Sequence, residues 1–165
     1  MAKKIEYRSL PTLLLRVREL MLAQFRPIIS HFGLTEQQWR VLRTLSDMGE
    51  MEQRELAAAC VILGPSLTGV LSRMEDMDLI VRTRMEEDQR RVTVRMSALG
   101  ERIVETVGPL VIQQYRNMED ALGAELLAEV VAVMDRVAGV DQRAIAQVSL
   151  PDPHGMDREL ARLRG

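Results

Sequence analysis

Five arginines surround a short acidic segment in the middle of the chain. Arg82, Arg84, Arg90, Arg91 and Arg95 flank Glu86-Glu87-Asp88. Guanidinium groups bind phosphate oxygens through paired N–H donors, and at the tip of a narrow ribbon they suit the minor groove of DNA, where negative potential is focused. Asp88 is close enough to Arg90 to pair with it and hold its guanidinium in position. The alternative is an ordinary charged turn.

A second group of polar residues lies upstream, on one side of a segment with helical spacing. Apolar residues at i, i+3, i+4 and i+7 predict a helix over about 65–77 that buries Leu67, Val70, Leu71 and Met74. Its other side carries small or hydrogen-bonding groups that let a surface approach closely. With the proline that starts the helix, these candidate contact residues are Pro65, Ser66, Thr68, Gly69, Ser72 and Arg73. An exposed polar helix face is the simpler interpretation of helical spacing alone.

Apolar spacing predicts three helices before this segment. The first covers about 10–30, and Pro27 should end or kink it. Thr35 and Gln38 form a capping-box pattern that starts the second helix, which ends at residues 47–49. The third is short, over about 52–61, and its predicted buried residues are Leu56, Ala57, Cys60 and Val61.

The apolar period changes from 3.6 to 2 between residues 79 and 96. This predicts one hairpin, with strands over 79–85 and 90–96, that must lean on the helices because a lone ribbon is unstable. Helix, turn, helix and hairpin in this order predict a winged helix-turn-helix, whose second helix enters the DNA major groove. Two more helices follow, over about 98–122 with a bend at Gly108-Pro109 and over about 124–146. The predicted fold class is mostly α.

The composition limits the classes of protein to which this chain can belong. The chain has 165 residues, 47% apolar and 28% charged, which is enough for one domain with a core and excludes general disorder. No run approaches the roughly 18 apolar residues of a membrane span. The basic N-terminus lacks the apolar segment of a secretory signal. With Cys60 as the single cysteine, these features predict a cytoplasmic protein with no membrane partner.

The net charge of −2 argues at first against a nucleic-acid partner. Divided by segment, however, residues 1–31 hold six basic residues against two acidic ones, and residues 82–95 hold five against three. The net charge of the whole chain therefore conceals segments that are locally basic. Site recognition would depend on a few well-placed arginines.

No set of residues offers catalytic or metal chemistry. His31 and His154 are the two histidines, and neither has a partner at metal-ligand spacing. The chain contains no phosphate loop, dinucleotide fingerprint or nucleophile elbow. We therefore predict no enzyme, no cofactor and no metal ion.

Arginines and aromatic rings on the first two predicted helices indicate a site for an aromatic acid. Arg18 lies seven residues before Phe25, so both are on one side of the first helix. With Trp39 and Arg40 they could hold an aromatic carboxylate by ion pairing and stacking. His31, in the following loop, could reach this site or be a solvated histidine. Arg18 could instead form an interface or interdomain salt bridge.

Residues 88–100 resemble a family signature. Asp88-Gln89-Arg90, five residues and Met96-Ser97-Ala98-Leu99-Gly100 resemble the D-x-R-x(5)-L-T-x-x-G motif of MarR-type regulators, with Met96 and Ser97 replacing Leu and Thr. Asp78 stands where most members have glycine, and aspartate tolerates the left-handed conformation better than most residues. The resemblance covers about residues 10–146. Further matching segments are Glu55-Leu56-Ala57, Pro65-Ser66-Leu67-Thr68, Leu71-Ser72-Arg73-Met74-Glu75 and Leu79-Ile80.

A narrower resemblance is to repressors of homoprotocatechuate operons. The matching segments are Arg18-Glu19, Phe25-Arg26-Pro27-Ile28, Leu34-Thr35-Glu36-Gln37-Gln38-Trp39-Arg40, Cys60 and Asp88-Gln89-Arg90-Arg91. It implies a repressor of aromatic-acid catabolic genes that leaves double-stranded operator DNA when a small aromatic carboxylate binds. Another phenolic effector, or oxidation of Cys60, is the alternative signal, although Cys60 is predicted to be a buried small side chain.

The long terminal helices carry more apolar surface than one DNA-binding module needs. We therefore predict a homodimer, with residues 8–33 and 98–147 as the dimerisation region, 34–97 as the winged helix-turn-helix and 148–165 as a C-terminal tail. Two-fold symmetry would suit a pseudo-palindromic operator, with recognition helices about 34 Å apart. An effector between the two regions would change that separation. A winged-helix module that binds protein and a small helical ligand-binding enzyme are the competing classes.

Overall fold

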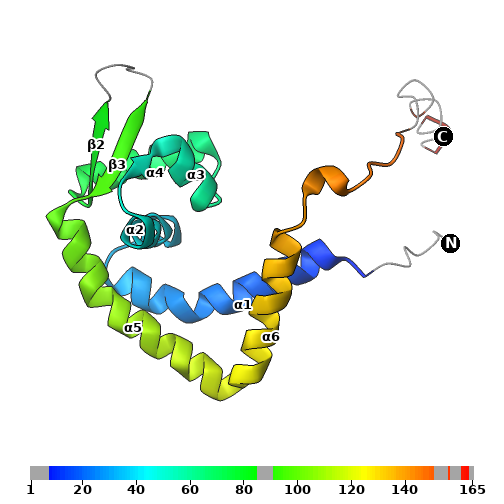
Figure 1. The fold of residues 1–165 in the computed structure, drawn as a ribbon, viewed down its shortest axis with the longest axis horizontal. Helices are drawn as coiled ribbons and strands as arrows, with labels where there is room; N and C mark the ends of the chain where they lie inside the picture. The colour runs from blue at the N-terminus through cyan, green and yellow to red at the C-terminus, as the bar shows by residue number, and fades with distance from the viewer. Residues whose placement is uncertain (1–7, 85–90, 151–155, 157–160, 164–165) are drawn as a thin grey trace. The chain divides into compact units, whose positions relative to one another are not determined.

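The computed structural model describes residues 8–84, 91–150, 156 and 161–163. It is mostly helical, with one small antiparallel sheet, as predicted (Figure 1). The contacts divide the chain after Ala121 into two compact units, each described by itself. The elements in order are α1 (Leu10–His31), α2 (Glu36–Met48), β1 (Met51–Glu52), α3 (Gln53–Ala59), α4 (Gly64–Asp76), β2 (Ile80–Arg84), β3 (Val92–Met96), α5 (Ala98–Leu122) and α6 (Ala124–Ala138), followed by a 3-10 turn (Gln142–Ala144).

Two proline-containing helices run without interruption. α1 continues through Pro27 to His31, so of the two predicted outcomes, an end or a kink, Pro27 does not end this helix. Proline removes one backbone hydrogen bond, but Phe25 and Ile29 on either side of it are both buried, and this burial offsets the loss. α5 likewise passes through Pro109.

α2 begins and ends as predicted. The Thr35 hydroxyl accepts the Gln38 N–H at 3.3 Å, while the Gln38 side-chain oxygen accepts the Thr35 N–H at 2.8 Å. Both halves of the capping box are therefore formed. Gly49, with φ of 78°, follows the last residue of the helix.

Three helices end in the same way, with a left-handed residue and a paired set of backbone hydrogen bonds. The left-handed residues are Gly33 after α1, Val61 after α3 and Asp78 after α4, with φ of 70°, 50° and 55°. After α3, the Ile62 N–H donates to the Ala57 carbonyl at 3.0 Å and the Val61 N–H to the Ala58 carbonyl at 3.1 Å. This pattern satisfies the last carbonyls of a helix. The prediction for Asp78 is confirmed.

The third helix is shorter than predicted, and the burial predicted for Val61 was wrong. α3 ends at Ala59, and the left-handed turn points the Val61 side chain outward, where 84% of its surface is exposed. A left-handed conformation strains a β-branched residue, so this turn is a strained point of the fold.

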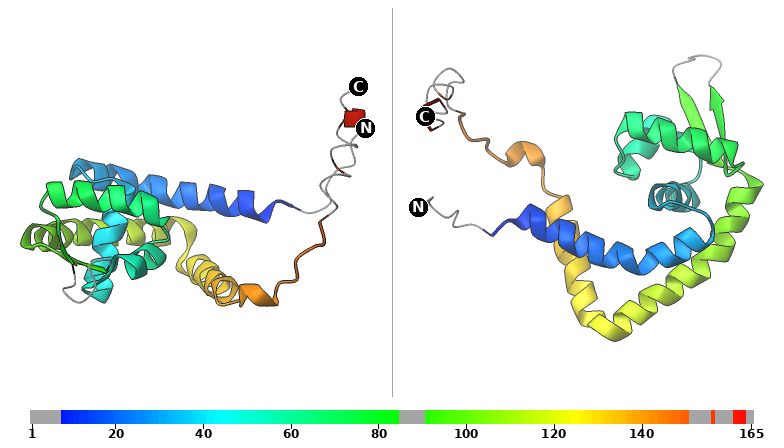
Figure 2. Two further views of the ribbon diagram at one scale, coloured as in Figure 1. Left: turned by 90° about the horizontal axis from the view of Figure 1, so that it is seen from above. Right: turned by 180° about the vertical axis from the view of Figure 1, so that it is seen from behind.

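The sheet has three strands, not the two of the predicted hairpin. Its order is β1-β3-β2, and all pairs are antiparallel. β1 adds Met51 opposite Val94 and Glu52 opposite Thr93, so residue 52 belongs to a strand rather than to the predicted third helix. The β2–β3 ribbon projects from the lobe on the side away from α1 (Figures 1 and 2).

The core lies between the three helices α2 to α4 and the sheet. Its fully buried side chains include Leu42, Leu56, Leu67, Leu71, Met74, Leu79 and Val94. We call residues 34–97 the lobe. At its edge, the Ser97 hydroxyl accepts the Gly100 N–H at 3.0 Å, so Ser97 caps the start of α5. Gly100 packs so closely that an added Cβ would lie 2.2 Å from the Leu79 carbonyl oxygen.

The terminal helices bury few of their apolar side chains. Before Phe25, no described residue of α1 is buried, and α6 has no buried residue at all. α6 also ends at Ala138, with Gly139 as its cap, eight residues before the predicted end. Among the described residues, no single helix combines the length and hydropathy of a membrane span; α3 and α4 pass that test only together, across a bend of 108°.

Candidate nucleic-acid interface and aromatic cavity

The outward side of α4 presents the residues that the sequence placed there. Pro65, Ser66, Thr68, Ser72 and Arg73 are exposed and Gly69 is half-buried. The four apolar residues predicted to face inward are all buried. The helix is thus fixed by its core side, and most of its polar side is exposed.

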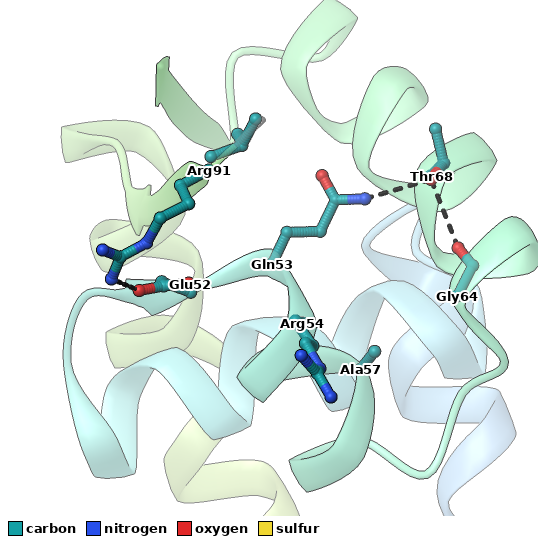
Figure 3. Close-up of a pocket in the computed structure, with 8 residues that line it drawn as sticks. Glu52, Gln53, Arg54, Ala57, Gly64, Thr68 and Arg91 are labelled. Atoms are coloured by element: carbon teal, nitrogen blue, oxygen red, sulfur yellow. Dashed lines mark hydrogen bonds and ion pairs between the residues drawn. The ribbon is translucent and has the colours of Figure 1, made fainter. Parts of the chain in front are cut away.

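Thr68 is already engaged by a residue that sequence reasoning missed. Its hydroxyl accepts a hydrogen bond from the Gln53 side-chain nitrogen at 3.0 Å and donates one to the Gly64 carbonyl at 3.2 Å (Figure 3). Gln53 is the first residue of α3. No sequence pattern links residues 53 and 68, because the contact depends on how α3 and α4 pack.

Two ion pairs hold the strands of the wing, β2 and β3, against the helices. Arg82 of β2 donates through Nε to Glu75 of α4 at 2.9 Å, and Arg91, just before β3, pairs with Glu52. Hydrogen bonding to these arginines lowers the pKa of Glu75 and of Glu52. The pairs therefore link the predicted wing to α4 and to β1, immediately before α3.

The structure describes only some of the other charged residues predicted for the wing. Arg84 is exposed at the end of β2. Arg95 donates to its neighbouring carbonyl, that of Met96, at 3.3 Å. The predicted Asp88–Arg90 contact lies outside the described residues.

A groove of about 790 Å³ separates α3, the start of α4 and the wing (Figure 3). Its lining residues are Glu52, Gln53, Arg54, Ala57, Gly64, Thr68, Arg91 and Val92. Arg54 is exposed. The groove thus combines guanidinium groups with an amide and a hydroxyl, the side chains that contact phosphates and base edges.

A second cavity, of about 440 Å³, lies among α1, α2 and α5. Phe25, Trp39 and Tyr115 supply aromatic rings, and the Phe25 and Tyr115 ring centroids are 4.7 Å apart. The other lining residues are Leu22, Ile29, Glu36, Arg40, Arg43, Thr44, Asp47 and Val111. We call it the aromatic cavity. Its mixture of apolar walls and a few charged groups is typical of a small-molecule site.

Charges at the aromatic cavity form a network around Glu36. Arg40 donates to Glu36 at 2.7 Å, Arg18 pairs with the same carboxylate, and Arg26 lies 3.7 Å from it. Arg40 also donates to the Cys60 carbonyl at 3.0 Å. Arg40 therefore connects the cavity to the end of α3.

The second set of predicted site residues is only partly brought together. Phe25, Trp39 and Arg40 line the aromatic cavity, whereas Arg18 reaches it only through its ion pair with Glu36. His31 does not line it: this histidine is the last residue of α1 and borders a separate depression with Phe32. Tyr115 was missed, because only the packing of α5 on α1 brings it to Phe25.

Cys60 is buried, as predicted. Its thiol donates to the Thr44 hydroxyl at 3.3 Å, and burial raises the thiol pKa. Burial therefore disfavours the thiolate that oxidation requires. Among the residues that the structure describes, no group of three His, Cys, Asp or Glu side chains is arranged to hold a metal ion.

Comparison with known proteins agrees with this architecture. The MarR family model matches residues 34–92. FarR, an HTH-type transcriptional regulator of Neisseria gonorrhoeae, is 37% identical over 82% of this chain and 97% of its own. The homoprotocatechuate degradative operon repressor of Escherichia coli is 35% identical over 77% and 86%. The crystal structure of NadR in complex with 4-hydroxyphenylacetate superposes with a TM-score of 0.73 and 35% identity, covering 86% of this chain and 100% of NadR.

Proposed function

Because the chain belongs to the MarR family of transcriptional regulators, we propose that it represses genes of aromatic-acid catabolism and leaves its operator when a small aromatic carboxylate binds. The relatives are named as regulators rather than enzymes. The observation that carries the finer proposal is the aromatic cavity, where three rings meet two arginines beside the DNA-binding lobe.

We assign DNA binding to α4 and the wing. The proposed contact residues are Pro65, Ser66, Thr68, Gly69, Ser72, Arg73, Arg84, Asp88, Arg90 and Arg91. The exposure of α4 along its polar side supports this assignment. α4 would lie in the major groove and the wing along the minor groove.

Members of the family bind DNA as dimers. For this chain we assign the dimer contacts to residues 8–33 and 98–147, with residues 148–165 as a tail. Exposed apolar side chains support the assignment: Leu15 and Leu20 on α1, Ile112 on α5 and Val133 on α6. Two recognition helices about 34 Å apart would then suit a pseudo-palindromic operator.

The effector proposal places an aromatic ring among Phe25, Trp39 and Tyr115. Its carboxylate would bind Arg40, which lines the same cavity. Similarity supports this chemistry, since NadR was crystallised with 4-hydroxyphenylacetate and another relative is named for homoprotocatechuate degradation.

Arg40 supplies a route from the effector to the DNA. A carboxylate that draws the Arg40 guanidinium into the cavity competes with its bond to the Cys60 carbonyl, at the turn that leads into α4. The effector then favours an arrangement of the lobe in which that bond is broken. DNA release follows if this arrangement binds the operator more weakly.

The test is operator binding titrated with small molecules. Genomic fragments selected by the protein give the operator, and fluorescence anisotropy then follows release by phenylacetate- and cinnamate-type acids. Phenols without a carboxylate distinguish an acid effector from another phenolic one. Calorimetry on Arg40→Gln should show weaker acid binding, with Arg102→Gln, an exposed arginine of α5, as the matched control. Acids that bind with unchanged affinity to Arg40→Gln, or that leave the operator complex intact, would contradict the proposal.

A further inference from the structure

We propose that Gln53, the first residue of α3, is a specificity-determining residue that reads an adenine in the major groove, and that Thr68 of α4 positions it. The inference rests on the DNA-binding role proposed above for α4. It adds a base contact from the other helix of the helix-turn-helix.

The hydrogen bonds of the Thr68 hydroxyl suit it to position Gln53 rather than to bind a base edge itself. A hydroxyl has one proton, and that of Thr68 is donated to the Gly64 carbonyl at 3.2 Å. The same oxygen accepts the Gln53 side-chain N–H at 3.0 Å. Because the hydroxyl proton faces Gly64, the Gln53 amide must turn its nitrogen toward Thr68. This contact therefore fixes the orientation of the Gln53 amide, with its nitrogen toward Thr68.

The groups left over on Gln53 match one base edge. A side-chain amide has two N–H donors and one carbonyl acceptor, and Thr68 takes one donor. One N–H and the carbonyl oxygen remain. Adenine presents an N6–H donor beside the N7 acceptor in the major groove, whereas guanine presents two acceptors there. A fixed amide therefore favours adenine.

The position of Gln53 suits a base rather than a remote phosphate. It is half-buried and stands in the groove between α3 and α4, with its oxygen turned away from Thr68 (Figure 3). Ala57 and Gly64 on the groove wall carry little or no side chain. Arg54 and Arg91 border the same groove, and guanidinium groups at its sides suit the phosphates that flank a base.

The experiment combines in vitro selection with atom-level changes in the DNA. Wild-type protein and Gln53→Ala each select binding sites from a randomised duplex library. We expect one adenine per half-site to lose its preference in Gln53→Ala, and affinity for the wild-type site to fall roughly 5- to 150-fold. Replacing that adenine by 7-deazaadenine, which lacks the N7 acceptor, should weaken wild-type binding several-fold and Gln53→Ala binding hardly at all.

Two further variants separate positioning from stability. Thr68→Ser keeps the hydroxyl and should keep the adenine preference, whereas Thr68→Val removes the hydroxyl and should relax it. Arg54→Ala, from the same groove, should weaken all sites alike and reduce the salt dependence of binding. Unchanged base preferences in Gln53→Ala, or equal binding of adenine and 7-deazaadenine sites by the wild-type protein, would overturn the inference while DNA binding stands. A wild-type protein that binds no duplex would overturn the DNA-binding assignment itself.

Discussion

The lobe and the terminal helices use apolar side chains in opposite ways. In the lobe, Leu42, Leu56 and Leu71 are completely buried within one chain. On α6, Leu126 and Val133 keep about half of their surface exposed, at 50% and 49%. Both regions show helical apolar spacing, yet only the lobe covers its apolar face with its own residues.

This difference shows where each region obtains its stability. A helix of 15 residues such as α6 is marginal in water without tertiary packing. The lobe has a core of its own, so its stability comes from within the chain. In the proposed dimer, a second copy would cover the apolar side chains of the terminal helices.

The strongest challenge to this comparison is a charge on α6. In a symmetric dimer Val133→Glu places two carboxylates in the interface, and burying each without a partner costs several kcal/mol. We expect the dimer dissociation constant to rise by more than about 100-fold, with loss of operator binding. Sedimentation equilibrium measures the first effect and fluorescence anisotropy the second. Glu129→Gln, an exposed change on the same helix, is the control; a Val133→Glu protein that stays dimeric would remove α6 from the interface.

Matched leucine deletions sharpen the same comparison. Leu71→Ala leaves a cavity in the lobe and should lower the free energy of unfolding by about 2–5 kcal/mol, while the dimer dissociation constant stays nearly constant. Leu126→Ala removes the same atoms from α6 and should mainly weaken the dimer. Urea unfolding and sedimentation, run on both proteins, separate the two effects. Equal effects of both variants on both measurements would erase the distinction between the regions.

The junction between lobe and α5 gives a smaller effect. Gly100→Ala would place a Cβ 2.2 Å from the Leu79 carbonyl oxygen, so the backbone must move. Overpacking of this kind costs about 1–3 kcal/mol, and we expect a matching fall in urea-unfolding stability. Gly69→Ala, inside α4, adds a Cβ that meets only the flexible Arg73 side chain, at 3.8 Å, and should be neutral or slightly stabilising. Similar losses from both substitutions would mean that close packing at residue 100 is unimportant.

The smallest effect concerns the ion pairs of the lobe. The pKa of Glu75 is lowered in the folded chain by hydrogen bonding to Arg82. The Glu75 carboxylate therefore contributes fully to stability above its pKa in the unfolded chain, near 4.5. This contribution is lost as the pH falls through the lower pKa that Glu75 has in the folded chain. Unfolding followed from pH 6 to pH 3 should show a slightly smaller acid loss for Glu75→Gln than for the wild type. Glu101→Gln, an exposed change on α5, should match the wild type.

Features set by neighbouring residues were predictable from the sequence. The buried stripe of α4 and the capping box of α2 both depend on residues within one or two turns, whereas the left-handed Asp78 was predicted from the family resemblance. β1 was missed because two residues become a strand only by pairing with β3, some forty positions away. The exposure of Val61 was missed because helical spacing was extended beyond the true end of α3.

The residues of the candidate sites show the same difference between features set by neighbouring residues and features set by distant contacts. Phe25, Trp39 and Arg40 follow from the faces of two adjacent helices and do meet in the aromatic cavity. Tyr115 comes from α5, and the Gln53–Thr68 contact joins two helices across a turn, so neither can be read from local spacing. His31 is exposed at the end of α1 and does not line the cavity, because its place in the chain fixed its distance from Phe25 but not the side of the molecule on which it lies.

The strained turn at Val61 marks a position where a substitution can raise the stability of this protein. A left-handed conformation costs a branched residue on the order of 1–2 kcal/mol, and this side chain, 84% exposed, regains little of that through burial. Asparagine or glycine tolerates the same backbone more readily. A single substitution outside the core thus offers a route to a more heat-resistant lobe, and the present sequence lies below the stability that its backbone permits.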